Sequence, residues 1–265
     1  MLYLVFGDVH GNLEALNAVL EAGEQREVEA YLFVGDLVGY GPNPMECIQC
    51  LMGLQSRGGM AWVAGNHDRV VRGDIEPTDF SEEALKTLEW TRRQVTEEKW
   101  ALKFLESAPM TAEVNGTIWL THESLADPGS GRYNREPQHA KPELTALSEK
   151  GGRICFYGHT HRLRAEVRDG PDTVFLIPIE PHDGDGRDPH PLHLKTGNVG
   201  WIGTGSAGFP INPKRSAECL ILDDREWRVE KYAVPYPRER TRARIRKVLG
   251  DECGRDLAEH IARWL

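Results

Sequence analysis

Residues 2–12 read Leu-Tyr-Leu-Val-Phe-Gly-Asp-Val-His-Gly-Asn, in which a short apolar run stops at a polar turn containing Asp8 and His10. The same pairing recurs along the chain. Apolar runs at 30–34, 60–64, 117–121 and 153–157 lead into Gly35-Asp36, Gly65-Asn-His-Asp-Arg69, His122 and Gly158-His-Thr-His-Arg162. Apolar runs of about five residues bounded by such breakers are typical of buried strands.

Helical patterns lie between these strands and indicate the fold class. Asn12 can cap a helix over 13–22, because its side chain can accept from a backbone N–H of the first turn. Ser81 followed by two acids predicts the start of a long helix over 81–105. Strands that alternate with helices predict an α/β domain.

The pattern changes after residue 162. Runs at 174–177, 219–222 and 226–232 predict strands, which we expect to form a second, more antiparallel sheet packed on the first. Residues 1–235 then form one domain, with 236–265 as a C-terminal helical extension packed on it. The basic stretch 238–247 in that extension is interpreted as a solvated helix face or an ordinary docked terminal helix.

The segment 178–200 is dense in Pro, Gly, Asp and His, and we interpret it as a long polar surface loop. Two alternatives stay open. The segment could be a lid that shapes substrate choice, or it could carry a third metal on His182, His190 and His193.

Composition places the chain among soluble globular proteins, with 265 residues, 40% hydrophobic and 28% charged. The first apolar run is far too short for a signal peptide, so a cytoplasmic protein is expected. A net charge of −9 argues against general nucleic-acid binding, and therefore against a nuclease. Cys47 and Cys50 form a CxxC, but no second pair accompanies it and both would share one helix face, which favours a structural role.

Each of the five strand ends carries a side chain that can bind a metal. The carboxyl ends of strands in open α/β sheets are where ligands bind. The set comprises Asp8, His10, Asp36, Asn66, His122, His159 and His161. Each residue alone has an ordinary structural explanation, but five such motifs in order favour a functional site.

This inventory of two carboxylates, one amide and four imidazoles suits two divalent ions that clamp an in-line displacement at phosphorus. We assign Asp36 as the bridging carboxylate. One ion would be completed by Asp8, His10 and His161, and the other by Asn66, His122 and His159. Attack by a hydroxide shared between the ions is the expected chemistry. The mixed nitrogen and oxygen donors favour Mn²⁺, with Fe, Zn²⁺ or Ni²⁺ as alternatives.

His67 follows Asn66 but is not needed to complete either ion. A histidine there can protonate the leaving-group oxygen or stabilise charge on the phosphoryl oxygens. Asp68 could orient it. We therefore predict His67 and Asp68 as catalytic residues, the alternative being an exposed polar turn.

These motifs resemble the calcineurin-like metallophosphoesterase superfamily, whose pattern is D-x-H, G-D, G-N-H-[DE], H and G-H-x-H. The resemblance implies a four-layer α/β/β/α sandwich with two metal ions at strand ends. Other stretches are similar to the small bacterial YfcE-like phosphodiesterases. They are Gly39-Tyr-Gly-Pro42, Gly65-Asn-His-Asp-Arg69, Trp90-Thr-Arg-Arg-Gln94 and Gly203-Thr-Gly-Ser-Ala-Gly-Phe-Pro210.

The resemblance also separates rival activities. Protein phosphatases carry G-D-x-V-D-R-G, whereas here Gly39 and Tyr40 stand in place of the Asp and Arg. A phosphodiesterase acting on a small nucleotide-type diester is therefore expected, with diadenosine polyphosphate hydrolysis and a non-catalytic binding scaffold as alternatives. Tyr40, Arg69 and Ser206 are candidate substrate-binding residues. One departure is Glu123, where the family usually has Gly after the histidine.

Overall fold

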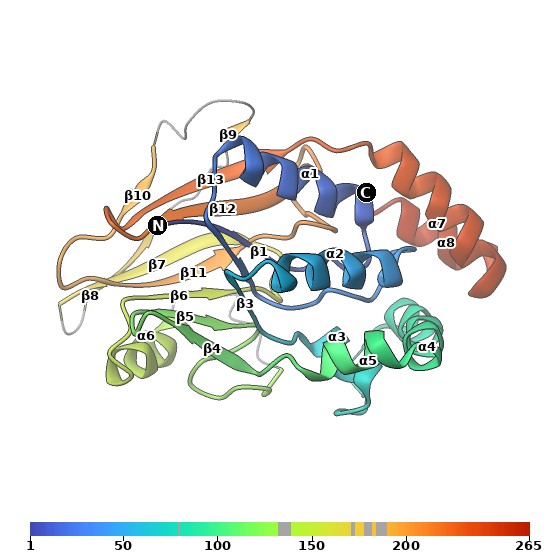
Figure 1. Cartoon of the computed structure of the whole chain (residues 1–265), viewed down its shortest axis with the longest axis horizontal. Coiled ribbons are helices and arrows are strands. Elements are labelled where there is room, and N and C mark those ends of the chain that lie inside the picture. The colour runs from blue at the N-terminus through green and yellow to red at the C-terminus, as the bar shows by residue number, and fades with distance from the viewer. Residues whose placement is uncertain (79, 132–138, 171–172, 178–181, 184–189) are drawn as a thin grey trace.

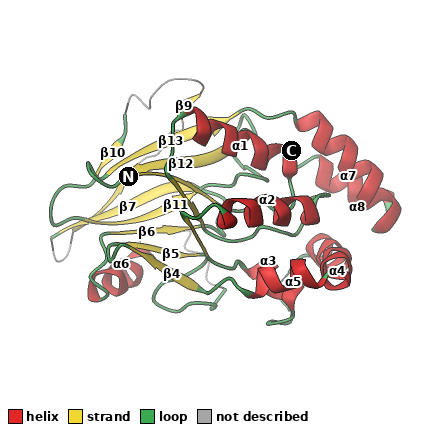
Figure 2. Cartoon of the chain, in the orientation of Figure 1, coloured by secondary structure: helices red, strands yellow, loops and turns green. Residues whose placement is uncertain are grey.

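Two β-sheets lie face to face between outer layers of helices (Figure 1). The computed structural model describes residues 1–78, 80–131, 139–170, 173–177, 182–183 and 190–265. Helices α1 (Leu13–Gln25) and α2 (Pro44–Ser56) cover the outer face of one sheet, and α6 (Ala140–Glu149) covers the other (Figure 2). This is the four-layer α/β/β/α sandwich that the family resemblance implied.

The first sheet has seven strands among the described residues. The order is β10 (Leu192–His193), β13 (Arg228–Val234), β12 (Ala217–Asp223), β1 (Leu2–Phe6), β2 (Ala30–Phe33) and β3 (Met60–Trp62), with β9 (His182–Asp183) also on β13. Strands β1, β2 and β3 are parallel, while β12 and β13 run antiparallel.

The second sheet has six strands among the described residues. The order is β4 (Thr111–Val114), β5 (Ile118–Thr121), β6 (Ile154–Tyr157), β11 (Val199–Thr204), β7 (Leu163–Asp169) and β8 (Thr173–Ile177). Its centre, β5, β6 and β11, is parallel, and the outer strands pair antiparallel.

Side-chain alternation along β1 shows how the layers are built. Leu4 and Phe6 pack in the cluster shared with the helices, whereas Tyr3 and Val5 pack in the cluster between the two sheets. Both faces of this strand are therefore buried, which explains why it reads as a continuous apolar run. Cys47 packs in the helix-side core as a free thiol, and burial raises its pKa.

The remaining helices gather at one end of the two sheets, the end toward which β1 and β2 run (Figure 1). They are α3 (Asn66–Arg72), α4 (Glu82–Glu97), α5 (Lys99–Glu106), α7 (Arg238–Glu252) and α8 (Arg255–Ala262). Helices α7 and α8 pack against each other, and α7 also contacts α1. None of the helices in the described ranges is long and apolar enough to cross a membrane.

The structure corrects the expected grouping of strands. The runs after residue 162 do not form a sheet of their own, because β12 and β13 extend the first sheet while β7, β8 and β11 extend the second. The five site-bearing strands are likewise divided, three in the first sheet and two in the second. Strand pairing is a long-range choice that periodicity along the chain does not record.

Two further expectations were wrong in detail. The single helix over 81–105 is two helices, because Glu98 leaves the helical conformation (φ −113°, ψ 93°) and lets Phe104 of α5 stack on Trp62 of β3. The segment 178–200 is not only loop. Its described parts include β9 and β10, both paired with β13, and the start of β11, while 178–181 and 184–189 lie outside the described residues.

Candidate metal centre

The seven expected ligands converge where the carboxyl ends of five strands meet. Asp8 and His10 follow β1, Asp36 follows β2, and Asn66 begins α3 just after β3. His122 follows β5, and His159 and His161 follow β6 in the opposite sheet. The two sheets join here directly, since the His159 N–H donates to Asp8 Oδ1 at 3.0 Å and His122 Nδ1 lies 2.7 Å from the Val34 carbonyl.

One group of donors centres on His10. Its Nε2 lies 3.1 Å from His161 Nε2 and 3.9 Å from Asp8 Oδ1, and His161 Nε2 lies 3.3 Å from the same oxygen. His161 Nδ1 is 3.0 Å from the Phe209 carbonyl, so that ring nitrogen carries the proton and Nε2 is left as the lone-pair donor. Asp8, His10 and His161 together can hold one cation.

The second group centres on Asn66. Its Oδ1 lies 3.1 Å from His122 Nε2 and 3.0 Å from His159 Nδ1. Because His122 Nδ1 donates to the Val34 carbonyl, Nε2, which faces Asn66, is the nitrogen that can bind a metal once its proton is displaced. These three residues are the set that the sequence assigned to a second ion.

Asp36 lies between the two groups. Its Oδ1 accepts from the His67 N–H at 2.9 Å, which fixes the carboxylate. Its Oδ2 lies 3.2 Å from His122 Nε2 and 3.7 Å from His10 Nε2, and so faces a donor of each group. A bridging role for Asp36 fits this position.

The backbone at the site is strained in a way that serves these contacts. Five of the seven candidate ligands have positive φ: Asp8 (51°), His10 (48°), Asp36 (56°), His159 (64°) and His161 (54°). A residue with a side chain rarely adopts this left-handed region, and doing so costs of order 1–3 kcal/mol. Strain of this kind persists only where surrounding contacts enforce it, and it clusters at functional sites.

The electrostatics of the cluster also fit bound cations. Burial alone would lower the pKa of His122, but Asp36, Asp8 and Glu123 outweigh it and raise the pKa to about 10. His10 behaves oppositely, since burial and then His67 hold its pKa well below the usual value. Buried Asp8 Oδ2 has no hydrogen-bond partner among the described residues. Such an acceptor in a pocket that attracts positive charge fits a metal ligand.

His67 is almost fully buried beside the cluster. Its ring packs edge-on against His10 with centroids 4.6 Å apart, and burial lowers its pKa. A Cβ added at Gly39, where φ is +133°, would lie 2.5 Å from His67 Nδ1. The glycine that distinguishes this chain from the protein-phosphatase pattern therefore makes room for His67.

Asp68 does not contact His67 in the way we expected. Its carboxylate accepts from three backbone N–H groups, those of Leu37 (2.9 Å), Val38 (3.2 Å) and Gly65 (3.0 Å). It thus ties the turn that carries Asp36 to the start of α3. Burial, and then the neighbouring Asp36, raise its pKa to about 7.

A cavity of about 500 Å³ opens beside the Asn66 group. It is lined by Asn66, His67 and His159 on the metal side and by Tyr40, Ile75 and Phe80 on an apolar side. Arg69 lies in its wall, 3.8 Å from Glu123, whose carboxylate also accepts from the Gly131 N–H. Glu123, the residue that departs from the family pattern, is therefore well placed to hold Arg69.

The three candidate substrate-binding residues are in different places. Tyr40 and Arg69 line the cavity, but Ser206 is fully buried. The Ser206 hydroxyl donates to the Asp8 carbonyl and accepts from the Phe209 N–H, both at 2.9 Å. Ser206 thus supports the Asp8 turn from behind.

Sequence reasoning missed the supporting roles of two residues near the metal centre. Asn12 caps α1 as expected, but its amide also donates to the Gly208 carbonyl and so holds the Asp8–His10 turn. Glu143 of α6 accepts from the hydroxyl of Ser124 and the N–H of Leu125 and thereby fixes the turn after His122. Glu143 carried no signal beyond being an acid on an apolar helix face.

Comparison with known proteins agrees with this geometry. A model of the calcineurin-like phosphoesterase superfamily domain matches residues 1–196. This chain belongs to that superfamily. It is therefore a metal-dependent phosphoester hydrolase of the metallophosphoesterase fold.

A metallophosphoesterase from Sphaerobacter thermophilus is similar over 100% of both chains, with a TM-score of 0.78 and 28% identity. A hypothetical protein from Pyrococcus horikoshii shares the fold, with a TM-score of 0.74 and 17% identity over 99% of this chain and 96% of that one. An uncharacterised protein of Methanocaldococcus jannaschii is 29% identical over 88% of this chain and 86% of its own. The asymmetrical bis(5'-nucleosyl)-tetraphosphatase of Bacillus subtilis is 26% identical over 51% of this chain and 62% of its own.

Proposed function

We propose that this protein hydrolyses a small nucleotide-type phosphodiester at a centre of two divalent ions, Mn²⁺ being the preferred metal. The observation that carries the proposal is the cavity of about 500 Å³ that adjoins the Asn66 group. A volume in this range accommodates a small-molecule ligand.

The ligand set supports two ions. Asp8, His10 and His161 would hold one, Asn66, His122 and His159 the other, and Asp36 both. When bound, two such ions supply Lewis acidity and lower the pKa of coordinated water. The backbone N–H groups that fix Asp8 and Asp36 keep both carboxylates aimed at the centre.

His67 supplies the remaining catalytic group. Burial lowers its pKa, so the imidazole is neutral at pH 7 before substrate binds, and it can donate one N–H hydrogen bond. An anionic phosphate beside it favours the protonated ring and makes proton donation to the leaving oxygen accessible. Asp68 serves this step indirectly by holding the backbone on either side of the His67 site.

The cavity provides for the part of the ester that does not react. Phe80 packs edge-on against His67 with centroids 5.1 Å apart, and Tyr40 lies on the same apolar side. Aromatic walls of this kind suit a flat base. Arg69, held by Glu123, is the cation available in the described wall for a second anionic group.

A second candidate is hydrolysis of a diadenosine polyphosphate. The similarity to the Bacillus subtilis tetraphosphatase favours it. The more specific resemblance to YfcE-like phosphodiesterases remains a prediction of the sequence motifs.

The test is a rate panel with Mn²⁺, in which bis-p-nitrophenyl phosphate, p-nitrophenyl phosphate, cyclic nucleotides and diadenosine tetraphosphate are compared. We expect the diester to exceed the monoester, and a wide preference for the monoester would refute the diesterase assignment. Two variants act as controls. His67→Ala is expected to lower kcat by roughly 10²–10⁴ with unchanged metal content, whereas Asp36→Asn should lose metal. Less than about one bound metal per chain after supplying Mn²⁺ would favour a binding scaffold.

A further inference from the structure

An aromatic cluster connects the C-terminal helices to the metal centre. Tyr40 packs against His10 and His67, with ring centroids 5.0 and 4.8 Å apart. On its other side Tyr40 meets Trp264, edge to face, at 5.1 Å and 85°. Phe209, whose carbonyl faces His161 Nδ1, lies 5.5 Å from Tyr40. Trp264 is thus one aromatic ring away from both His10 and His67.

Trp264 is held firmly in this position by arginines of α7. Arg242 donates to the Ala262 carbonyl at 3.2 Å, and Arg238 donates to the Leu265 carbonyl at 3.0 Å, so the backbone is fixed on both sides of Trp264. Arg246 of α7 also pairs with Glu259 of α8 at 2.7 Å. The basic stretch 238–247 therefore orders α8 through contacts within the protein.

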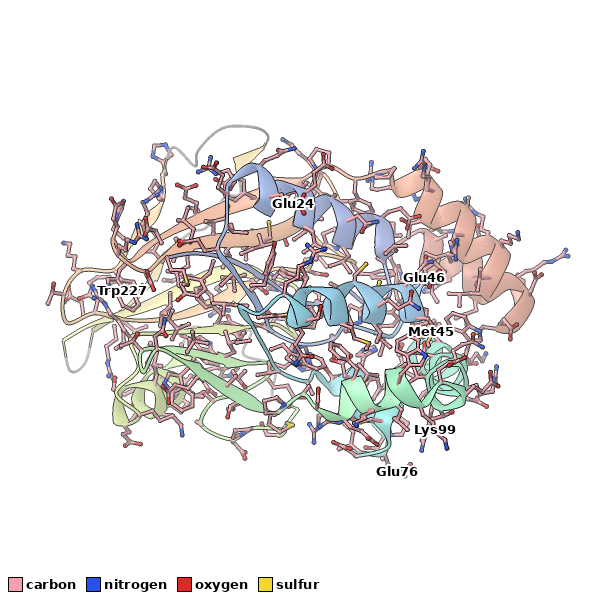
Figure 3. The ribbon with its side chains drawn as sticks, in the orientation of Figure 1. Glu24, Met45, Glu46, Glu76, Lys99 and Trp227 are labelled. Carbon is pink, nitrogen blue, oxygen red and sulfur yellow. The ribbon has the colours of Figure 1, made fainter. Side chains whose placement is uncertain are left out.

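Helix α7 is in turn attached to the turns of the metal centre. The Thr241 hydroxyl lies 3.1 Å from Asn12 Oδ1, and Asn12 is two residues after His10. Arg244 pairs with Glu46, which lies near the start of α2. Figure 3 labels Glu46 beside the C-terminal helices. These contacts connect α7, on which α8 packs, to the segment that carries His10.

We propose that Trp264 is a positioning residue, which holds Tyr40 against His67 and so keeps the His67 imidazole aligned for catalysis. Gly39 approaches His67 without a side chain of its own, and the ring of the next residue, Tyr40, packs against the His67 ring with centroids 4.8 Å apart. The inference rests on the proposed function insofar as it concerns catalysis. It assigns an active-site role to a residue beyond 1–196, the part that the family model matches.

The direct test compares three variants of the metal-loaded protein. Trp264→Ala removes the contact, Trp264→Phe keeps an aromatic ring, and Trp227→Ala is the control. Trp227 lies at the opposite end of the molecule from α8 (Figure 3). Its ring packs under Arg153, whose Cζ lies 4.2 Å from the ring centroid. The kinetic readout is kcat for methyl phosphodiesters with 4-nitrophenyl or phenyl leaving groups, together with KM and metal content.

Misalignment of a proton donor matters most for a poor leaving group, because a good one departs without protonation. For Trp264→Ala we expect kcat with the phenyl ester to fall by roughly 10-fold to 100-fold, and kcat with the 4-nitrophenyl ester to change much less. Metal content and KM stay near the wild-type values. Trp264→Phe recovers most of the phenyl-ester rate, and Trp227→Ala leaves both rates unchanged.

A second readout does not depend on activity. In protein loaded with diamagnetic Zn²⁺ and labelled with ¹⁵N-histidine, the ring signals of His67, assigned with His67→Ala, should shift in Trp264→Ala but not in Trp227→Ala. Unshifted His67 signals would overturn the inference. So would an equal loss of rate for both leaving groups, because that pattern indicates general structural damage. If the wild type cleaves neither ester but the signals shift, the positioning role stands and the proposed diesterase function fails.

Discussion

Replacing Asp68 with alanine should show whether this carboxylate acts on His67 or on the backbone. Asp68 is fully buried and accepts from the N–H groups of Leu37, Val38 and Gly65. Alanine leaves all three donors without an acceptor. The turn carrying Asp36 would then lose its attachment to the start of α3.

The magnitude follows from the three contacts. A hydrogen bond to a charged group contributes about 1.5–3 kcal/mol, so simple addition gives roughly 5–9 kcal/mol. The burial cost of the carboxylate, which the rise of its pKa to about 7 reveals, offsets part of this sum. We therefore expect Asp68→Ala to lower the free energy of unfolding by about 3–5 kcal/mol, at the upper end for a single substitution.

Asp68→Asn provides a graded comparison. The asparagine oxygen can still accept from Leu37 and Val38, while its amide group faces the Gly65 N–H. We expect a loss of about 1–3 kcal/mol, the cost of one unmade buried hydrogen bond. Glu82→Ala is the matched control, because Glu82 is an exposed acid paired with the exposed Lys86, and such pairs contribute about 0–1 kcal/mol.

Urea unfolding followed by circular dichroism gives these free energies. Measurements with and without EDTA separate the effect of losing metal from the effect of losing the hydrogen bonds to the Asp36 turn. Metal content and kcat are measured on the same samples. The structure predicts that stability and metal affinity fall together. A wild-type unfolding free energy combined with a collapse of kcat would refute this reasoning and restore the direct catalytic role expected from the sequence.

Three other perturbations probe the same site. Arg69→Ala should raise KM about tenfold, which corresponds to the loss of one charge-assisted contact, and should leave the metal content unchanged. Michaelis kinetics that show only an effect on kcat would argue against Arg69 as a substrate-binding residue. The pKa of His122 is raised to about 10, so below that pH a metal must displace a proton from His122 in order to bind. The apparent Kd for the metal should therefore decrease as the pH is raised toward 10. Calorimetry in buffers of different ionisation enthalpy would measure the proton release. Burial raises the pKa of Glu218 from 4.5 to about 7, so its ionisation destabilises the fold as pH rises through that interval. Glu218→Gln should therefore gain up to about 3 kcal/mol at pH 8 and nothing below about pH 4.5, and a pH-independent difference in urea unfolding would contradict the shift.

The sequence could predict that the candidate ligands lie together because each of them is tied to a local feature. Asp8, Asp36 and His122 each follow an apolar run that can only be a buried strand, and strand ends are where side chains can converge. The α/β class and the capping of α1 by Asn12 depend on the same local physics of strand, turn and helix start.

The pairing of strands depended on tertiary structure. The predicted runs 174–177 in β8 and 219–222 in β12 are both short and continuously apolar, yet the first joins the second sheet and the other joins the first sheet. An apolar run can pair in either sheet, so the choice depends on packing between the sheets and on the connections available. The division of the ligand-bearing strands between two facing sheets follows from that choice.

Tertiary structure also decided what each polar residue contacts. Asp68 and Ser206 sit in motifs that suggested contact with His67 or substrate, but buried backbone donors and acceptors near them required partners, and these side chains supply them. Trp264 carries no motif at all, and its place beside Tyr40 depends on the apolar packing of α8 and on the arginines of α7 that hold the end of that helix. The sequence by itself determined which residues can bind metal, since that is a property of each side chain. Only the folded chain determined how they are held, because hydrogen-bond satisfaction and aromatic packing depend on segments more than 200 residues apart, such as Tyr40 and Trp264.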